Sequence, residues 1–270
     1  MLDDYRTPGI LTDLTPEQHE IVARVDGVPV ALCRAAQSVL MLPELAIASG
    51  VDASRASGKN VRPAAELLGI ALRLSEAPLG PPRPMDRRVL GTCRHFAVLA
   101  CALLRAHAIP ARARCGFETY FRPGWHNDHW ITEYWDDSRW VRIDSEILGL
   151  DLVEHPDDLA ARQCLTGSEA WAAYRQGADP MTFGVHGTEN WGAAEIVGNA
   201  IRDLAALNKI EVLPWDEWGP MRACYDTGLT PQIETLMDDL VDATSSDDQA
   251  RLLRLYDAMP VPGGMIITQP

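Results

Sequence analysis

Residues 89–146 read VLGTCRHFAVLACALLRAHAIPARARCGFETYFRPGWHNDHWITEYWDDSRWVRIDSE, and this stretch decides the fold. Cys93 opens an apolar run, His129 opens a strand-like run and Asp144 lies near the end of the next one. From Thr92 to about His107 the residues are almost continuously apolar, which predicts a helix that is buried on most sides. The stretch therefore predicts a central helix followed by strands, with three reactive side chains among them.

The strands are expected in the middle third of the chain only. Residues 111–121 become rich in strand formers and end at the turn Pro123–Gly124. Residues 129–135 and 140–145 are aromatic and β-branched, and the polar segment Asp136–Arg139 between them predicts a hairpin. These runs predict a small antiparallel sheet packed on the helix that begins near Cys93.

Helical patterns occupy the chain on both sides of this stretch. Thr15 and Gln18 form a capping-box pattern around Pro16, which predicts a helix through about Val25. Residues 77–84 hold four prolines and are expected to be a loop, and residues 50–60 a polar connection. A loop is also expected at 214–220, and further helices at 28–42 (ended by Pro43), 63–75, 167–175, 191–207, 230–241 and 247–259. The fold class is therefore α+β, with helices from both ends around the sheet.

Composition excludes several classes of partner. The 270 residues are 47% apolar, which is ample for a core, and 24 Lys+Arg against 38 Asp+Glu give a net charge of -14. Nucleic acid and anionic membranes are therefore poor partners. Neither a signal-peptide pattern nor an apolar run near the ~18 residues of a membrane span is present in the sequence. We expect a soluble, cytoplasmic protein.

The six cysteines indicate reduced thiols in a cytoplasm. They include no C-x-x-C pair and no histidine at zinc-ligand spacing, so we expect no structural metal and no cofactor. Five of them lie in apolar or helical surroundings that favour a small buried side chain. Cys93 differs, because Thr92 is a plausible N-cap and places it in the first turn of a helix. There the helix dipole and unpaired N–H groups stabilise a thiolate and could receive the oxyanion of a tetrahedral intermediate.

A thiolate nucleophile needs a base, and the base needs a group that orients it. A two-residue hairpin loop at Asp136–Asp137 would place His129 directly across from Asp144. A four-residue loop, Asp136–Arg139, makes the two residues diagonal neighbours. A three-residue loop without a bulge would put them on opposite faces of the sheet. The prediction is therefore a loop of even length, with both side chains on one face.

Other side chains in the stretch have competing interpretations. His126 is expected in the turn, and a metal site made of His126, Asp128, His129 and Glu133 is unfavourable because a strand scatters these residues over both faces. His95 lies two positions after Cys93 and should point elsewhere, as a surface residue or behind the site. Glu133 and Arg142 are candidates for a cross-strand ion pair. Trp125 and Trp130 flank the expected cleft and are candidate substrate-binding residues, although tryptophans at such positions more often belong to the core.

Outside this stretch, residues 183–191 (FGVHGTENW) are the most unusual. Two glycines and a cap before a long helix explain them structurally, and His186 is a further candidate for substrate binding. The acidic segment 214–220 carries two tryptophans and is either a lid or a packed loop.

These residues resemble a known family. The spacing of His129, Glu133, Trp135, Trp140 and Asp144 is similar to the H-x3-E-x-[aromatic]-x4-W-x3-D pattern of the transglutaminase-like superfamily. The run G-x-C-R-x-F-A…L-L-R-A-x-x-I-P-A-R-x-x-x-G-F over 91–117 resembles its nucleophile helix and following strand. Departures are Ala108 for the usual glycine, Ile131 for an aromatic residue and Ser145 for the proline that often follows the Asp. None of them is a position of the catalytic triad.

The resemblance implies a papain-like core in which Cys93 is the nucleophile, His129 the general base and acid, and Asp144 the residue that holds the imidazole. Residues 1–61 would form a helical N-terminal region, 62–147 the catalytic core and 148–270 a helical C-terminal extension packed on the core. The expected function is cleavage or transfer at an amide or thioester bond of a peptide, protein or small molecule through an acyl-enzyme. The alternatives are a non-catalytic binding protein that keeps the fold and a small-molecule acyltransferase of a biosynthetic pathway.

Overall fold

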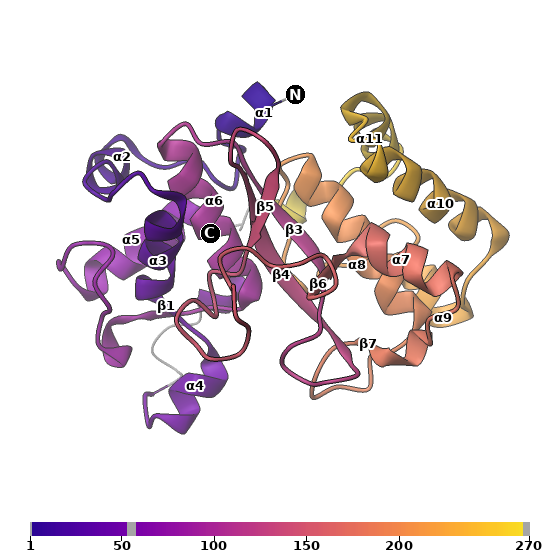
Figure 1. The fold of residues 1–270 in the computed structure, drawn as a ribbon, viewed down its shortest axis with the longest axis horizontal. Helices are drawn as coiled ribbons and strands as arrows, with labels where there is room; N and C mark the ends of the chain where they lie inside the picture. Colours follow the sequence, from indigo (N-terminus) through magenta and orange to yellow (C-terminus); the bar gives the residue numbers. More distant parts are fainter. Residues whose placement is uncertain (1, 53–57, 267–270) are drawn as a thin grey trace. The chain divides into compact units, whose positions relative to one another are not determined.

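The computed structural model describes residues 2–52 and 58–266 (Figure 1). The α-helices are α1 (Leu2–Arg6), α2 (Pro16–Val22), α3 (Pro29–Val39), α4 (Pro43–Ala48), α5 (Ala64–Leu74), α6 (Cys93–Ala106), α7 (Gly167–Arg175), α8 (Ala193–Leu207), α9 (Met221–Thr227), α10 (Pro231–Ser245) and α11 (Gln249–Asp257). The strands are β1 (Leu40–Met41), β2 (Val89–Leu90), β3 (Ala111–Glu118), β4 (His126–Trp135), β5 (Trp140–Ile143), β6 (Cys164–Thr166) and β7 (Phe183–Gly184). The expected α+β class with a small, mainly antiparallel sheet is confirmed.

The chain forms two compact units that are not consecutive in sequence. The first contains the described residues from 2 to 113 together with Ile131–Leu159, and the second contains Arg114–Trp130 and Ala160–Ile266. Strands β3 and β4 each run through both units. The three consecutive segments expected from the sequence stay a prediction.

In the first unit, helix α6 is the central element. Its residues from Arg94 to Arg105 are all buried, and α2, α3 and α5 pack against it (Figure 1). Each fully buried Leu or Val side chain in such a core contributes about 1.5–3 kcal/mol through the hydrophobic effect. The N-terminal helices are therefore part of the same core as the predicted nucleophile helix.

The hairpin of β4 and β5 has the predicted even-length loop. Trp135 pairs with Trp140 and Thr132 with Ile143, so the loop is the four residues Asp136–Arg139. The Asp136 carboxylate accepts hydrogen bonds from the backbone N–H groups of Ser138 and Arg139 at 3.0 and 2.8 Å. This Asx-type turn explains why the polar segment closes the hairpin at this length.

Five strands make one sheet, in which β5, β4, β3 and β6 follow one another and β7 pairs with β4. Gly116 lies where β3 meets β6, and a Cβ there would come within 1.9 Å of the Leu165 carbonyl oxygen. The close approach of the two backbones therefore requires glycine at this position.

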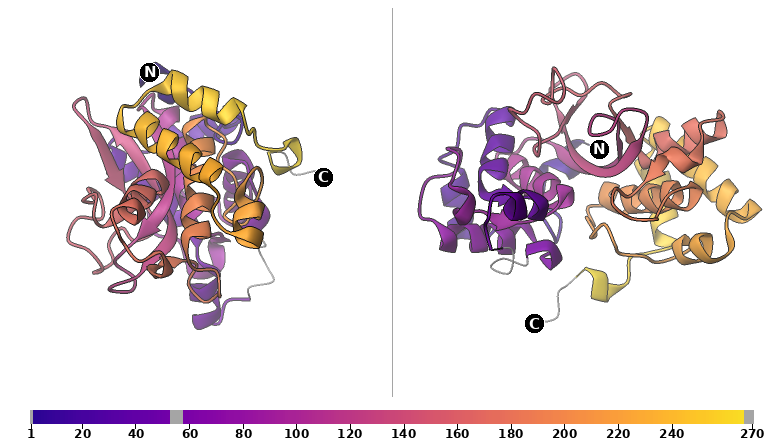
Figure 2. Two further views of the ribbon diagram at one scale, coloured as in Figure 1. Left: turned by 90° about the vertical axis from the view of Figure 1, so that its right-hand side faces the viewer. Right: turned by 90° about the horizontal axis from the view of Figure 1, so that it is seen from below.

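The second unit is built around α8, which is buried from Glu195 to Leu207. Helices α7, α9, α10 and α11 pack against it or against one another, and Figure 2 shows them as the orange to yellow layer. Asp203 of α8 accepts two hydrogen bonds from Arg114, at 3.0 and 2.8 Å, and a third from the Cys115 backbone N–H at 2.9 Å. This buried pair ties α8 to β3.

Most expected elements are confirmed, including the capping box of Thr15 and Gln18 and the helix over 167–175. The expectation that strands occur only in the middle third was wrong. Strands β1 and β2 pair in parallel with each other, and β7 pairs in parallel with β4. They are two residues long, too short for a periodic signal.

Prolines account for further differences between prediction and structure. Pro43 begins α4, since proline suits the first turn of a helix as well as it ends one. Helix α9 directly follows the expected loop over 214–220 and was not predicted. Within the polar connection expected at 50–60, residues 53–57 lie outside the described residues, and Gly58–Asn60 form a short 3₁₀ turn.

Candidate active site

Cys93 is the first residue of α6, as predicted, and Thr92 is its N-cap. Cys93 is half-buried, whereas the other five cysteines are buried. Its position exposes the sulfur to the positive end of the helix dipole and to the N–H groups of the first turn. Among the thiols of this chain, the one singled out by sequence is therefore also the one within reach of a reagent.

His95 completes the N-terminal cap of α6. The Thr92 backbone N–H donates to Nδ1 of His95 at 2.9 Å, which is the role Glu or Gln plays in a standard capping box. Because Nδ1 accepts, the neutral ring carries its proton on Nε2 and donates to the Val61 carbonyl oxygen at 3.0 Å. Burial, followed by the nearby Arg94 charge, lowers the pKa of His95 to about 3. His95 is thus a buried structural residue that positions the turn carrying Cys93.

We predict that His95 makes stability fall as the pH falls. In the unfolded chain His95 is protonated below its ordinary pKa of 6.5, whereas in the folded state it is protonated only below about pH 3. Between these two pH values the unfolded state binds one more proton, so protonation favours unfolding. We expect His95 to lower the free energy of unfolding by about 2 kcal/mol between pH 7 and pH 5.

The measurement is urea unfolding of the wild type and of His95→Gln at both pH values. Gln18 already serves as a capping-box residue in this chain, so glutamine retains the acceptor and removes the titration. The pH-dependent loss should shrink by about 2 kcal/mol in the variant. Equal losses in both proteins would contradict the assignment.

Asp144 follows the last residue of β5 and is 1% exposed. Its backbone N–H donates to the Pro156 carbonyl oxygen at 2.9 Å, and its carboxylate accepts from the Glu146 backbone N–H at 2.9 Å. One oxygen of the carboxylate is therefore engaged in a local turn that fixes the direction of the side chain.

Helix α3 holds the segment that follows Asp144. The Gln37 side chain donates to the carbonyl oxygens of Glu146 and Leu148 at 3.0 and 2.8 Å. Cys33 of the same helix is fully buried, and this burial raises the pKa of its thiol to about 12. Cys33 is thus no competing nucleophile. No sequence motif links α3 to Asp144, so this support was missed.

The predicted ion pair of Glu133 and Arg142 is present and has a third member. Glu133 accepts from Arg142 at 3.1 Å and from Arg112 of β3 at 2.7 Å. The Glu133 side chain is 3% exposed, so the network is buried. The Arg112 guanidinium also lies 4.0 Å from the Trp140 ring centroid. The network therefore ties the hairpin that carries Asp144 to the neighbouring strand.

His129 lies in the part of β4 that belongs to the second unit and is 3% exposed. The rings of Tyr120 and Phe121 meet its imidazole edge to face, at centroid distances of 6.1 and 5.6 Å. Both aromatic residues come from the loop between β3 and β4. They restrict the orientation of the imidazole.

Glu118 fixes this loop. One of its carboxylate oxygens accepts from the backbone N–H groups of Tyr120 and Phe121 at 2.6 and 2.7 Å, and the other accepts from the Asn127 amide at 2.5 Å. Loss of hydration raises the pKa of the adjacent Asp128, with the charges of Arg202 and His129 opposing the shift. Neither Glu118 nor the two aromatic residues carried a sequence signal, since their roles depend on a loop that folds back on β4.

The expectation that His126 lies in the turn was wrong. His126 is the first residue of β4 and pairs with Phe183 of β7. Its imidazole stacks on the Phe183 ring at 4.0 Å with an interplanar angle of 8°, and Nδ1 lies 3.2 Å from the Thr182 hydroxyl. The pairing with β7, which sequence could not foresee, extends the strand to this residue.

The three candidate substrate-binding residues divide into two groups. Trp125 and His186 line the same pocket of the second unit, together with Trp191. Trp130 is 1% exposed and belongs to the core, because the side of β4 that carries it is covered. We therefore keep only Trp125 and His186 as candidates.

Within residues 2–52 and 58–266 no three His, Cys, Asp or Glu side chains gather in a way that could hold a metal ion. In the same residues, no helix combines the length and the apolar character needed to cross a membrane.

Comparisons with known proteins agree with the resemblance seen in the sequence. Residues 80–145 match the family model of the transglutaminase-like superfamily. The matched segment includes Cys93, His129 and Asp144, so this part of the chain is similar to a transglutaminase-like core.

One solved structure is similar at low identity. It is the "Putative Cysteine Protease from Cytophaga hutchinsonii", with 20% identity and a TM-score of 0.22 over 59% of this chain and 50% of that chain. The match thus spans half the length of that protein. No curated protein matches this chain.

Proposed function

We propose that this protein is a thiol-dependent enzyme that cleaves or transfers acyl groups at an amide or thioester bond, with Cys93, His129 and Asp144 as its catalytic residues. The observation that carries the proposal is the position of Cys93. It is a half-buried cysteine at the capped N-terminus of a buried helix, inside a transglutaminase-like core. That position stabilises a thiolate, which is the nucleophilic form.

In the proposed reaction the Cys93 thiolate attacks the carbonyl carbon of the substrate, and a C–S bond forms. The negative oxygen of the tetrahedral intermediate is stabilised by backbone N–H groups at the start of α6. The intermediate collapses, the bond to the leaving amine or thiol breaks, and protonated His129 delivers a proton to that group. A thioester acyl-enzyme remains.

The second half of the reaction releases the acyl group. His129 removes a proton from water or from an acceptor amine as this nucleophile attacks the thioester carbon. The C–S bond then breaks, and Cys93 returns as the thiolate. Water gives hydrolysis and an amine gives transfer, so the exclusion of water from the acyl-enzyme decides between them.

Asp144 is proposed to hold the imidazole of His129 in the required tautomer. The four-residue hairpin loop supports this, because it is one of the two loop lengths for which alternation sets His129 and Asp144 on one face. Two contacts support it further. The Glu146 backbone N–H donates to the Asp144 carboxylate, and the Gln37 side chain donates to the Glu146 carbonyl oxygen, so the direction of the Asp144 side chain is fixed.

The proposal is tested by the pH dependence of Cys93 alkylation. Iodoacetamide modification is followed residue by residue with mass spectrometry between pH 5 and pH 10. We expect Cys93 to react with a midpoint at least about one pH unit below the ~8.5 of an unperturbed thiol, and His129→Ala to raise that midpoint. In urea the midpoint should return to about 8.5.

Buried Cys101 and Cys224 in the same digest serve as internal controls for unfolding. If Cys93 titrates in the folded protein as it does in urea, the thiol is not activated. In that case the alternative of a non-catalytic binding protein with a transglutaminase-like fold is favoured.

A further inference from the structure

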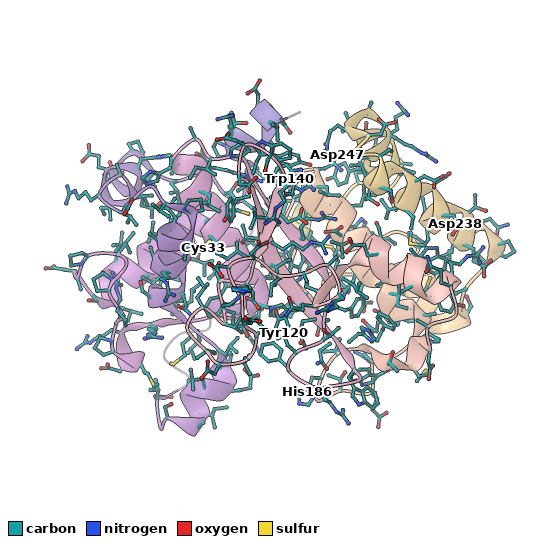
Figure 3. All side chains as sticks on the ribbon, in the orientation of Figure 1. Cys33, Tyr120, Trp140, His186, Asp238 and Asp247 are labelled. Atoms are coloured by element: carbon teal, nitrogen blue, oxygen red, sulfur yellow. The ribbon has the colours of Figure 1, made fainter. Side chains whose placement is uncertain are left out.

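A pocket of about 380 Å³ lies in the second unit, at the loop between β7 and α8. That loop contains the unusual sequence GVHGTEN, whose His186 is labelled in Figure 3. The volume is within the range of small-molecule sites. Its lining includes six residues with large or charged side chains: Arg122, Trp125, Met181, His186, Glu189 and Trp191.

The aromatic wall of the pocket is held in place before any ligand arrives. Trp125 and Trp191 meet edge to face with their centroids 4.8 Å apart. The indole N–H of Trp191 donates to the Thr188 carbonyl oxygen at 3.0 Å. A Cβ on Gly184 would lie 2.5 Å from the Trp191 ring, so glycine lets the indole pack directly on the backbone. A rigid wall of this kind loses little entropy when a ligand binds.

Arg122 is an arginine held by stacking. Its guanidinium lies 4.1 Å from the Trp125 ring centroid, and within the described residues no carboxylate forms an ion pair with it. Stacking uses the face of the guanidinium and leaves the N–H donors at its edge for another group. A planar pair of such donors matches a carboxylate.

We infer that this pocket binds a carboxylate attached to an aromatic or similarly flat apolar group. Arg122 takes the carboxylate, and Trp191 and Met181 contact the flat group. His186, which is exposed beside them, supplies a further donor. Glu189 is the acidic residue of the lining, and its charge opposes the ligand rather than recognising it.

A link between this pocket and the proposed reaction rests on the proposed function. The loop that joins β3 and β4 carries Arg122 and Trp125 at its end, and Tyr120 and Phe121 against His129 at its beginning. The pocket and the proposed base thus share one short loop. In that reaction the pocket holds the carboxylate-bearing aromatic part of the substrate, as at the C-terminus of a peptide.

Binding is tested on the full chain carrying Cys93→Ala, so that turnover plays no part. Isothermal titration calorimetry compares N-acetyl-phenylalanine with its amide and with 3-phenylpropanoate. The first acid mimics a peptide C-terminus and the second a free aromatic acid. We expect the peptide mimic to bind at least about tenfold more tightly than its amide, because the amide cannot pair with the guanidinium.

Variants assign the effect to the pocket. Arg122→Leu should weaken binding of the acid at least about tenfold and leave the amide unchanged, whereas Arg122→Lys should restore part of the affinity. Glu189→Gln should strengthen binding of the acid. Arg222→Leu is the matched control, since Arg222 is an exposed arginine of the same unit outside the pocket.

Equal affinities for the acid and the amide, no saturable binding of either at millimolar concentration, or no effect of Arg122→Leu would overturn the inference. Weaker binding of the acid to Glu189→Gln would also overturn it, because the charge of Glu189 would then not oppose the ligand. Tighter binding of 3-phenylpropanoate than of the peptide mimic would assign the pocket to free aromatic acids. Since Cys93 is absent from this experiment, its failure is distinct from a failure of the alkylation test.

Discussion

The Cys93→Ala variant is expected to form no covalent acyl adduct and to turn over substrates at least about 10³-fold more slowly than the wild type. The physical reason is that the thiolate is the only group in the proposed reaction that bonds to the carbonyl carbon, so its loss removes the whole two-step route. Turnover is measured with a panel of p-nitrophenyl esters, thioesters and glutamine-containing peptides, with and without an added amine. Intact-protein mass spectrometry follows the adduct.

A double variant makes this prediction specific to a triad. His129→Ala alone should lower turnover by about 10²–10⁴-fold, whereas adding it to Cys93→Ala should cost almost nothing further, since residues that act as a unit are not additive. Cys224→Ala, at a buried cysteine of the second unit, is the control and should leave turnover unchanged. Full activity in Cys93→Ala, or multiplicative losses in the double variant, would refute the assigned roles.

Glu133→Gln is expected to lower the free energy of unfolding by about 3–5 kcal/mol. Glu133 is the anion between Arg112 and Arg142, and all three side chains are at most 15% exposed. Glutamine is similar in shape but neutral, so two buried guanidinium groups lose the charge that compensates their desolvation. Urea unfolding at neutral pH measures the loss. The same variant should weaken catalysis only through the hairpin, because Glu133 takes no part in the chemistry.

An exposed pair in the same hairpin region gives the matched control. Arg139 and Asp158 form an ion pair with side chains 54% and 47% exposed. Solvent screens this pair, so Asp158→Asn should cost less than about 1 kcal/mol. Similar losses in the two variants would show that burial of the network does not control its contribution.

Several features of the candidate site followed from local sequence. The first turn of α6 was predictable because Thr92 and the apolar run after it define a helix start within a few residues. The four-residue hairpin loop was among the predicted lengths because strand alternation and the polar segment Asp136–Arg139 restrict the register. The approximate positions of the longer helices followed from their apolar periodicity.

Features that depend on long-range pairing escaped prediction. Sequence alone placed His126 in a turn, because no neighbouring residue indicates that β4 is extended by pairing with the two residues of β7. It considered His95 a surface or supporting residue without recognising an N-terminal cap, because histidine rarely takes that role. The hold of Gln37 on the Asp144 segment spans more than a hundred residues and has no local pattern.

Local sequence determined the order of Cys, His and Asp, the helix that begins at Cys93 and the even length of the hairpin loop. Periodicity, capping and turn chemistry act over a few neighbouring positions, so these features can be predicted from them. The tertiary structure decided which charges are buried, which tryptophan belongs to the core and which lines a pocket, and how the chain divides into two units. Those outcomes depend on which distant segments exclude water from one another, and a single sequence does not carry that information locally.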